Sequence, residues 1–407
     1  MSTRTKDEIL WLRTRGTLLL AVVALWVAPP SEAASQARST GLEFAGLPAL
    51  NFDADEGFGY GALAEVYQYG DGSVTPYQWT LQPTIFLTTR GRRDIDVFLD
   101  APGILPRGWR FSVFLGTARQ IATPYYGIGN GSIYDATLTE EEGPNPYYYR
   151  FGRTSHSLTF SVQKDLGTER LRGLFGGGLV RTTINPFPRD EGTTLYAADF
   201  GGAEVKESAR YVRGGIVWDT RDRQTGPTRG TWTELILQVV QGSAGADGSY
   251  LRWTVADRRY FSLTDRLVFA HRYLLQGVGN GVPAYDMSKI QSSFKPHQGL
   301  GGSSSARGIA QNRFIGRGLL LWNSEFRWRA LDFQFRGDPA RLVLVAFVDQ
   351  GRAWAEGLDV GEIFSDLHRG YGGGVRLGYG DDFTVAYDLA TSSTTGLQVY
   401  IGLGYLY

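Results

Sequence analysis

The sequence has no cysteine, and only four histidines and two methionines among its 407 residues. Without thiols there is no disulfide, no thiolate metal site and no lipid-anchored cysteine. The 41 basic and 41 acidic residues cancel, so the charge gives no case for a nucleic-acid partner. The histidines do not cluster with acidic residues at a metal-binding spacing. We therefore predict no cofactor, no metal and no nucleic acid.

Long apolar runs are also missing. After residue 40 the longest run covers residues 342–348, far short of the roughly 20 residues that a spanning helix needs. The mean hydropathy of −0.21 is too low for a helical membrane protein. No segment shows the helical period. These absences exclude a membrane protein built from helices.

The N-terminal segment has the pattern of a secretory signal. Arg13 and Arg15 precede an apolar stretch over residues 17–28, and small residues follow it as cleavage candidates. An apolar core of about a dozen residues is short for a retained anchor. We expect residues 1–37 to be removed and residues 38–407 to form the mature fold.

Glycine and aromatic residues are abundant, with 54 Gly, 22 Tyr, 22 Phe and 10 Trp. Apolar and polar residues alternate with a period of two through most of the chain, which is typical of strands. In residues 397–407 every odd position is apolar or aromatic, ending on Tyr405 and Tyr407. An apolar face on a final aromatic strand is what a bacterial outer-membrane barrel needs for closure. We predict that these tyrosines form the terminal barrel signal.

The alternation predicts an all-β fold, a transmembrane outer-membrane β-barrel of sixteen antiparallel strands with no periplasmic domain. An even number of strands leaves both termini on one side, in the periplasm. The expected strands cover residues 45–52, 57–68, 77–88, 92–101, 109–120, 149–164, 170–184, 208–220, 230–241, 250–261, 266–278, 318–331, 341–351, 370–378, 383–389 and 396–407.

Connection lengths agree with this count. The four long connections, 121–148, 185–207, 279–317 and 352–369, all fall between an outgoing and a returning strand. Long loops outside and short turns inside are typical of outer-membrane barrels. We therefore expect an integral protein of the bacterial outer membrane, in contact with its lipid.

One long connection carries a single arginine, Arg307, among small residues that include Gly308. Asp349 lies on a following strand, and Glu325 lies on the strand between them, opposite an aromatic face. A wide lumen has room for Arg307 to pair with either carboxylate, and a buried pair would be left uncompensated by loss of one partner.

These segments resemble the BamA/TamA superfamily, also called the bacterial surface antigen family. The resemblance rests on the Arg-Gly loop, the Phe347-to-Trp354 strand motif, the strand–turn–strand segment 215–230 and the aromatic end. It implies that Arg307 folds into the lumen and pairs with Asp349 first and Glu325 second. Ala306 and Ile309 depart from the family pattern, which often has larger side chains there.

The resemblance implies a role in inserting or translocating proteins, or lipids, at the outer membrane. Family transporters carry periplasmic receptor domains, and we expect none here, so a periplasmic partner is a candidate to replace them. Unfolded barrel proteins or secreted proteins are the expected clients. The family mechanism needs a weak seam between the first and last strands. A short first strand with Pro48, and glycines in the last strand, fit such a seam.

Two alternatives remain. A passive structural barrel or channel could use inward charges for selectivity, namely Asp94, Asp96, Asp100, Arg110, Glu234 and Arg327. An outer-membrane enzyme is the other, but His156 cannot pair with its flanking serines in a strand. The 302–305 segment also lacks the Gly-x-Ser-x-Gly pattern of a nucleophile elbow. We therefore predict that the protein is not an enzyme.

Overall fold

The computed structural model describes residues 40–53, 57–74, 76–89, 91–139, 145–188, 192–242, 248–293, 297–335, 337–380 and 383–407. The predicted signal segment, residues 1–37, lies outside the described residues. Among the residues described, no helix has both the length and the apolar character needed to cross a membrane.

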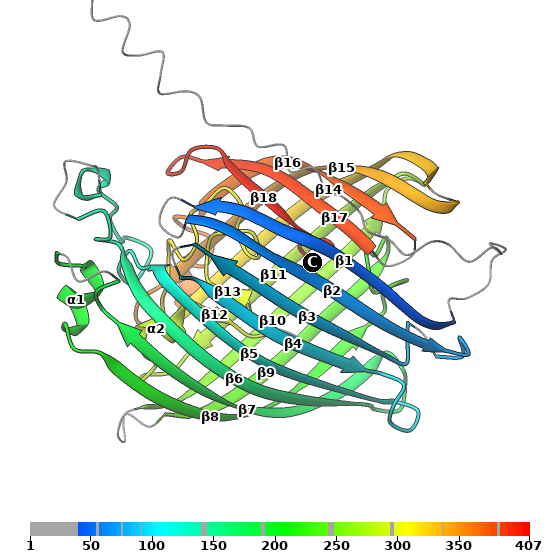
Figure 1. The fold of residues 1–407 in the computed structure, drawn as a ribbon, viewed down its shortest axis with the longest axis horizontal. Helices are drawn as coiled ribbons and strands as arrows, with labels where there is room; N and C mark the ends of the chain where they lie inside the picture. Colours follow the sequence, from blue (N-terminus) through cyan, green and yellow to red (C-terminus); the bar gives the residue numbers. More distant parts are fainter. Residues whose placement is uncertain are drawn as a thin grey trace, which may run out of the picture.

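The main element is one sixteen-stranded antiparallel sheet, which curls into a barrel (Figure 1). Strands adjacent in the sheet follow the chain order, with β11 pairing to β14. This confirms the predicted all-β class and strand number. The strands are β1 (Gly41–Asp53), β2 (Gly57–Gly70), β3 (Trp79–Thr88), β4 (Arg93–Ala101), β5 (Trp109–Pro124), β6 (Arg150–Asp165), β7 (Leu171–Asn185), β8 (Val205–Asp219), β9 (Gly230–Gly242), β10 (Ser249–Ser262), β11 (Leu267–Val278), β14 (Gly318–Phe335), β15 (Asp338–Trp354), β16 (His368–Tyr379), β17 (Phe383–Ser392) and β18 (Gln398–Leu403).

The four long connections leave from the same end of the barrel, which we call the loop end; the opposite end is the turn end. They hold short elements that the alternating pattern did not reveal. These are η1 (Ala136–Leu138), α1 (Leu195–Phe200), α2 (Ala284–Met287), the strand pair β12 (Lys289–Ile290) and β13 (His297–Gln298), and η3 (Val360–Glu362). In Figure 1 the helices α1 and α2 lie together at the loop end.

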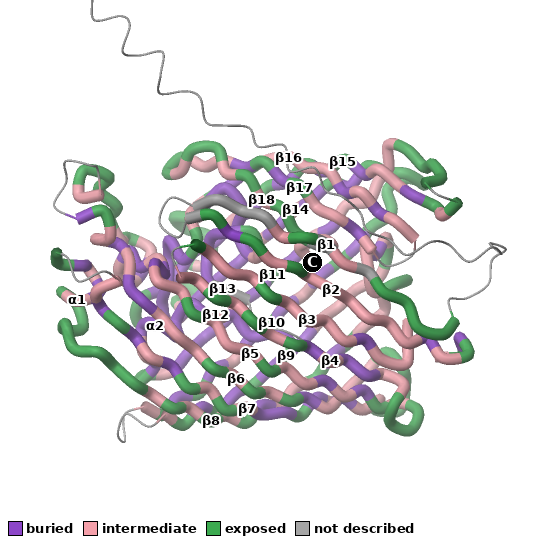
Figure 2. The backbone as a smooth tube through the Cα atoms, viewed as in Figure 1, coloured by how far each residue is buried: buried purple, intermediate pink, exposed green. Residues whose placement is uncertain are grey.

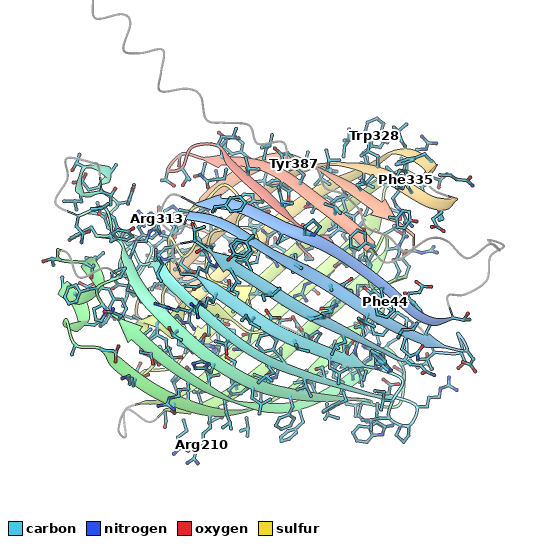
Figure 3. All side chains as sticks on the ribbon, in the orientation of Figure 1. Phe44, Arg210, Arg313, Trp328, Phe335 and Tyr387 are labelled. Carbon is cyan, nitrogen blue, oxygen red and sulfur yellow. The ribbon has the colours of Figure 1, made fainter. Side chains whose placement is uncertain are left out.

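Each strand turns polar and small side chains inward and apolar ones outward, as β10 illustrates. Arg252, Thr254 and Arg258 are buried, whereas Leu251 and Phe261 are exposed. Figure 2 shows the resulting mixture of buried and exposed segments around the wall. Exposed aromatic residues stand on several strands, among them four labelled in Figure 3: Phe44, Trp328, Phe335 and Tyr387. An apolar exterior around a polar interior is the pattern of a membrane barrel.

A β-bulge between Arg329 and Leu331 keeps the outer face of β14 continuous. Before the bulge Phe326 and Trp328 are exposed, and after it Leu331 and the following odd-numbered aromatics are exposed. One extra residue reverses the alternation, so the apolar face continues to the end of the strand.

The connection between β11 and β14 folds into the barrel rather than away from it. Its buried residues Ile290, Leu300 and Phe314 pack against wall residues such as Leu274 and Leu321. A second apolar cluster at the loop end joins residues of this connection to strands β5–β11, including Tyr125, Phe151, Tyr196, Val240 and Tyr285. The interior at the loop end is therefore filled by protein.

Both edge strands differ from the expectation. The first strand spans thirteen residues, Gly41–Asp53, and pairs with β2 along its whole length, so it is not short and Pro48 lies within it. The last strand ends at Leu403 rather than at residue 407. Gly404, with φ +75°, turns the chain there, and its amide donates to the carbonyl of Thr384. The apolar stripe predicted to run on to Tyr407 therefore stops at Leu403.

Candidate functional site

The candidate site is centred on the part of the β11–β14 connection around Ser305 and Arg307, which lies inside the barrel. Ser305 ties this loop together: its Oγ accepts from the amide of Gly301 at 2.9 Å and donates to the carbonyl of Gly299 at 2.5 Å. Gly308 has φ +86°, a conformation that favours glycine, and its amide donates to the Tyr400 hydroxyl at 3.0 Å. Two residues after Ser305, Arg307 is thereby directed at the inner wall.

Arg307 is 1% exposed and contacts three carboxylates. Its Nε donates to Asp349 Oδ2 at 2.7 Å, and its Nη2 donates to Asp349 Oδ1 at 3.2 Å. The Arg307 amide also donates to Asp349 Oδ2 at 3.0 Å. Nη2 lies 3.0 Å from Glu325 Oε2, and Nη1 donates to Asp388 Oδ2 at 3.1 Å. The structure thus brings Arg307 together with both predicted partners and with a third carboxylate.

The three carboxylates hold two further arginines. Arg327 Nε donates to Glu325 Oε1 at 2.7 Å, and Arg376 Nη1 donates to Asp388 Oδ1 at 2.6 Å. Three guanidinium groups therefore face three carboxylates in what we call the lumen cluster, formed by Arg307, Glu325, Arg327, Asp349, Arg376 and Asp388. Every member is at most 6% exposed. Charges buried this deeply require such pairing.

Sequence reasoning missed Asp388 and Arg376. Asp388 is the acidic residue between the exposed Tyr387 and Leu389, and therefore shares the inward face of β17. Arg376 is likewise the polar residue between Val375 and Leu377 on β16. Strand alternation alone could have identified both as inward charges, but not their common partner Arg307.

The electrostatics of the cluster keep Arg307 charged. Burial by itself would lower the pKa of the guanidinium, but the nearby Asp349 and Glu325 raise it well above its usual value. The guanidinium carbon also lies 3.4 Å from the centre of the Phe347 ring, a cation–π contact. The loop is therefore held by a cation that cannot lose its charge.

A second set of contacts fixes the backbone next to Arg307. The carbonyl of Ser305 accepts from Asn323 Nδ2 at 2.7 Å and from Arg272 Nη2 at 3.2 Å. Arg272 Nε also donates to Asn323 Oδ1 at 2.8 Å. Ala306 and Ile309, the two departures from the family pattern, are fully buried in the apolar cluster under the loop. The small Ala306 and the aliphatic Ile309 are thus accommodated by close packing in this cluster.

The predicted terminal tyrosines lie inside rather than on the lipid face. Beyond β18, Tyr407 donates from its hydroxyl to the carbonyl of Ala270 on β11 at 3.1 Å, and its own carbonyl oxygen accepts from Arg327 at 2.9 Å. The Arg327 guanidinium carbon lies 4.3 Å from the centre of the Tyr405 ring. The tail 404–407 is therefore linked to the lumen cluster through Arg327.

The strand–turn–strand segment forms an ordered connection at the turn end. The Arg221 guanidinium donates two hydrogen bonds to Asp219, both of 2.9 Å, and stacks on Trp232. Asp222 accepts from the amide and the hydroxyl of Thr228, at 2.9 and 2.6 Å. These contacts hold the 220–229 connection in one shape next to the tail. Within the part of the chain that the structure describes, no group of three or more acidic or histidine side chains could hold a metal ion.

The chain is a sixteen-strand β-barrel of the outer-membrane type, and an arginine-bearing loop is held inside its lumen by ion pairs. The model of the Omp85 superfamily domain matches residues 88–393. The chain belongs to the Omp85 superfamily, which places it among bacterial outer-membrane barrels. Among curated proteins, no sequence matches it.

Solved structures share the fold at low sequence identity. BamA from Haemophilus ducreyi lacking POTRA domains 1–3 has a TM-score of 0.53 at 11% identity, over 94% of this chain and 75% of that one. CdiB from Escherichia coli gives 0.55 at 11% identity, over 94% and 67%. CdiB from Acinetobacter baumannii gives 0.51 at 12%, over 94% and 64%, so this chain spans less than two thirds of that protein.

Proposed function

We propose that this barrel aids the insertion or translocation of polypeptides at the outer membrane, using the seam between its first and last strands. The observation that carries the proposal is the unpaired seam. Among the described residues β1 pairs with β2 and β18 pairs with β17, and no pairing joins β1 to β18. Each edge strand leaves a row of backbone donors and acceptors for another strand.

The two edges differ in a way that favours exchange. β18 is only six residues long, and its pairing with β17 covers residues 398–403. β1 offers thirteen residues of edge. A client strand can add to such an edge through main-chain hydrogen bonds, whatever its side chains. The edge itself would therefore supply affinity without sequence specificity.

In this proposal the lumen cluster is a lock that keeps the last five strands, β14–β18, in register while a client strand occupies the seam. Arg307 joins β14, β15 and β17 through Glu325, Asp349 and Asp388. Gly308 adds β18 through the Tyr400 hydroxyl. A wall held from inside in this way keeps its fold without any pairing between β1 and β18. Clients or a receptor would arrive at the turn end, where a periplasmic partner is the expected substitute for receptor domains.

The test is client folding in vitro. The protein is reconstituted in liposomes, an unfolded small β-barrel protein is added, and its folding is followed against empty liposomes and an Arg307→Ala variant. Acceleration that depends on Arg307 supports the proposal. Ion conductance without acceleration would contradict it and favour the passive channel. The control variant is Arg210→Ala, which removes an exposed arginine from the outer side of β8.

A further inference from the structure

The lumen holds a cavity at the turn end whose charged lining is mainly arginine. Its charged lining residues are Arg223, Asp265, Arg266, Arg327, Arg329 and Arg341, five cations against one carboxylate. They come from the 220–229 connection, the turn before β11, and strands β14 and β15. Elements that are distant in the sequence thus place positively charged side chains around one cavity.

The described part of the chain neutralises these cations only in part: Arg223 pairs with Asp222, Arg327 with Glu325 and Arg329 with Asp332. Arg341 donates to the carbonyl of Gly380 at 3.0 Å, and Arg329 donates to the carbonyl of Asp265 at 2.9 Å. Within the described residues, neither Arg266 nor Arg341 forms an ion pair. Arg327 is 4% exposed, yet its Nη1 has no hydrogen-bond partner there. A buried guanidinium with an unused donor is costly unless an acceptor reaches it.

The size and place of the cavity restrict what can fill it. Its volume is about 70 Å³, several times the roughly 10–15 Å³ of cavity volume that holds one water. It therefore admits a single carboxylate or phosphate group. Of the arginine side chains, those of Arg327 and Arg329 lie on the inner face of β14, opposite the exposed Trp328 on the lipid side. Lipid headgroups around the barrel are thus separated from it by the wall.

A second, larger cavity continues from the first. It has a volume of about 200 Å³ and shares Thr225 and Thr384 with the arginine cavity. Its lining offers hydroxyl and amide groups, including Tyr67, Tyr77 and Gln224, together with one carboxylate, Glu65, which accepts from the Tyr67 hydroxyl at 2.6 Å; the cavity reaches Gly404 beyond β18. The two cavities together form a polar path from the arginine side of the lumen toward strands β2 and β3. Such a path suits an extended polypeptide of a few residues.

We propose that the turn end binds an acidic segment of an extended polypeptide, with one Asp or Glu carboxylate seated among Arg266, Arg327 and Arg341. Guanidinium groups bind carboxylates through paired, charge-assisted hydrogen bonds, which gives the site its selectivity. The inference rests on the proposed function, because it gives the polypeptide that approaches the seam a chemical character. The segment would lie beside β2 and β3, next to the unpaired β1.

The test uses the full chain folded in detergent and a fluorescent ten-residue peptide of alternating Asp and Ser, read by anisotropy. Replacing every Asp of the peptide by Asn should weaken binding at least about tenfold, since a charged hydrogen bond contributes about 1.5 kcal/mol. The Arg266→Gln/Arg341→Gln variant should show a similar loss. The matched control is Arg107→Gln, an arginine at the same end that is 93% exposed and outside the cavity.

Equal binding of the Asn peptide, or an equal loss in Arg107→Gln, would overturn the inference. Displacement of the peptide by phosphatidylglycerol vesicles but not by phosphatidylcholine vesicles would also overturn it, because the site would then bind lipid. If the double variant misfolds, Arg266→Gln alone, on an exposed turn, replaces it. Client folding is assayed separately. Loss of peptide selectivity with Arg307-dependent folding intact refutes only this inference, whereas the converse refutes only the proposed function.

Discussion

The backbone of Gly370 on β16 lies against the carbonyl oxygen of Arg307, so closely that a Cβ on Gly370 would overlap this oxygen. The absence of a side chain at one wall position thus lets the loop reach its ion-pair partners. The lumen cluster depends on this space as much as on its charges.

Gly370→Ala should therefore displace the loop and destabilise the barrel by about 1–3 kcal/mol, the usual effect of overpacking. Urea unfolding in detergent measures the change. The matched control is Gly396→Ala, at a glycine with no atom within 4 Å of the added Cβ and without a left-handed φ. Equal stability of the two variants would show that the loop is not held against β16.

Asp349→Ala should destabilise the barrel by about 3–5 kcal/mol, because it leaves the buried Arg307 without its main partner. The separate variant Arg307→Lys should keep only part of the stability of the natural chain, since an ammonium group cannot make the paired contact to Asp349. The unfolding midpoint of both variants gives the order. A lysine variant as stable as the natural chain would contradict the role of the paired geometry.

Acid should loosen the loop end through Asp286 on α2. Its carboxylate lies 2.7 Å from Arg252 and 2.5 Å from Lys289. Burial alone would raise its pKa, but these cations hold the pKa well below its ordinary value of 3.8. Because the pKa is lower in the folded state, the stability it contributes is full above about pH 4 and is lost as pH falls below that value.

Hydrogen exchange of residues 282–290 between pH 5 and pH 2 measures this loss. Asp286→Asn should exchange faster at pH 5 and show a weaker dependence on acid than the natural chain. An unchanged slope in Asp286→Asn would assign the acid sensitivity to another group.

Arg327→Gln should release the tail 404–407. The change removes the 2.9 Å hydrogen bond to the Tyr407 carbonyl and the contact with the Tyr405 ring. Since the chain has no cysteine, Leu406→Cys gives a unique thiol for maleimide labelling. Labelling should become about tenfold faster, as expected for a lost charged hydrogen bond. Arg329 forms no hydrogen bond or ion pair with the tail among the described residues, so the labelling rate should not change in Arg329→Gln.

Strand alternation carried most of the fold. Fifteen of the predicted strands differ from the observed ones only at their ends, because inward and outward positions alternate along most of each strand and are interrupted only by local bulges such as the one after Arg329. The predicted end of the last strand was wrong, because the alternation of apolar residues continues past Gly404 whereas the backbone turns there. Apolar side chains satisfy a lipid-facing strand and a packed lumen tail equally well, so the pattern cannot distinguish them.

The site was predictable only in part. Arg307, Asp349 and Glu325 came from motif resemblance and strand alternation, and the structure brings these side chains together. Asp388 lies on β17, 81 residues after Arg307 in the sequence. Its partnership depends on the curvature of the barrel and on the space left by Gly374, whose Cβ would overlap the Asp388 carboxylate. No periodic pattern in the sequence reports that two such distant residues lie close together in space.

The most direct test of the central claim is disulfide trapping at the seam. Single cysteines are placed at Glu43 on β1 and, separately, at Ile401 on β18, with Leu179→Cys on β7 as an exposed control away from the seam. Each variant is mixed with an unfolded small barrel protein that carries one cysteine in its last strand. We predict cross-links at Glu43→Cys or Ile401→Cys and none at Leu179→Cys. Cross-linking that is equal at all three positions, or absent at both edges while the client still folds faster, would contradict strand addition at the seam.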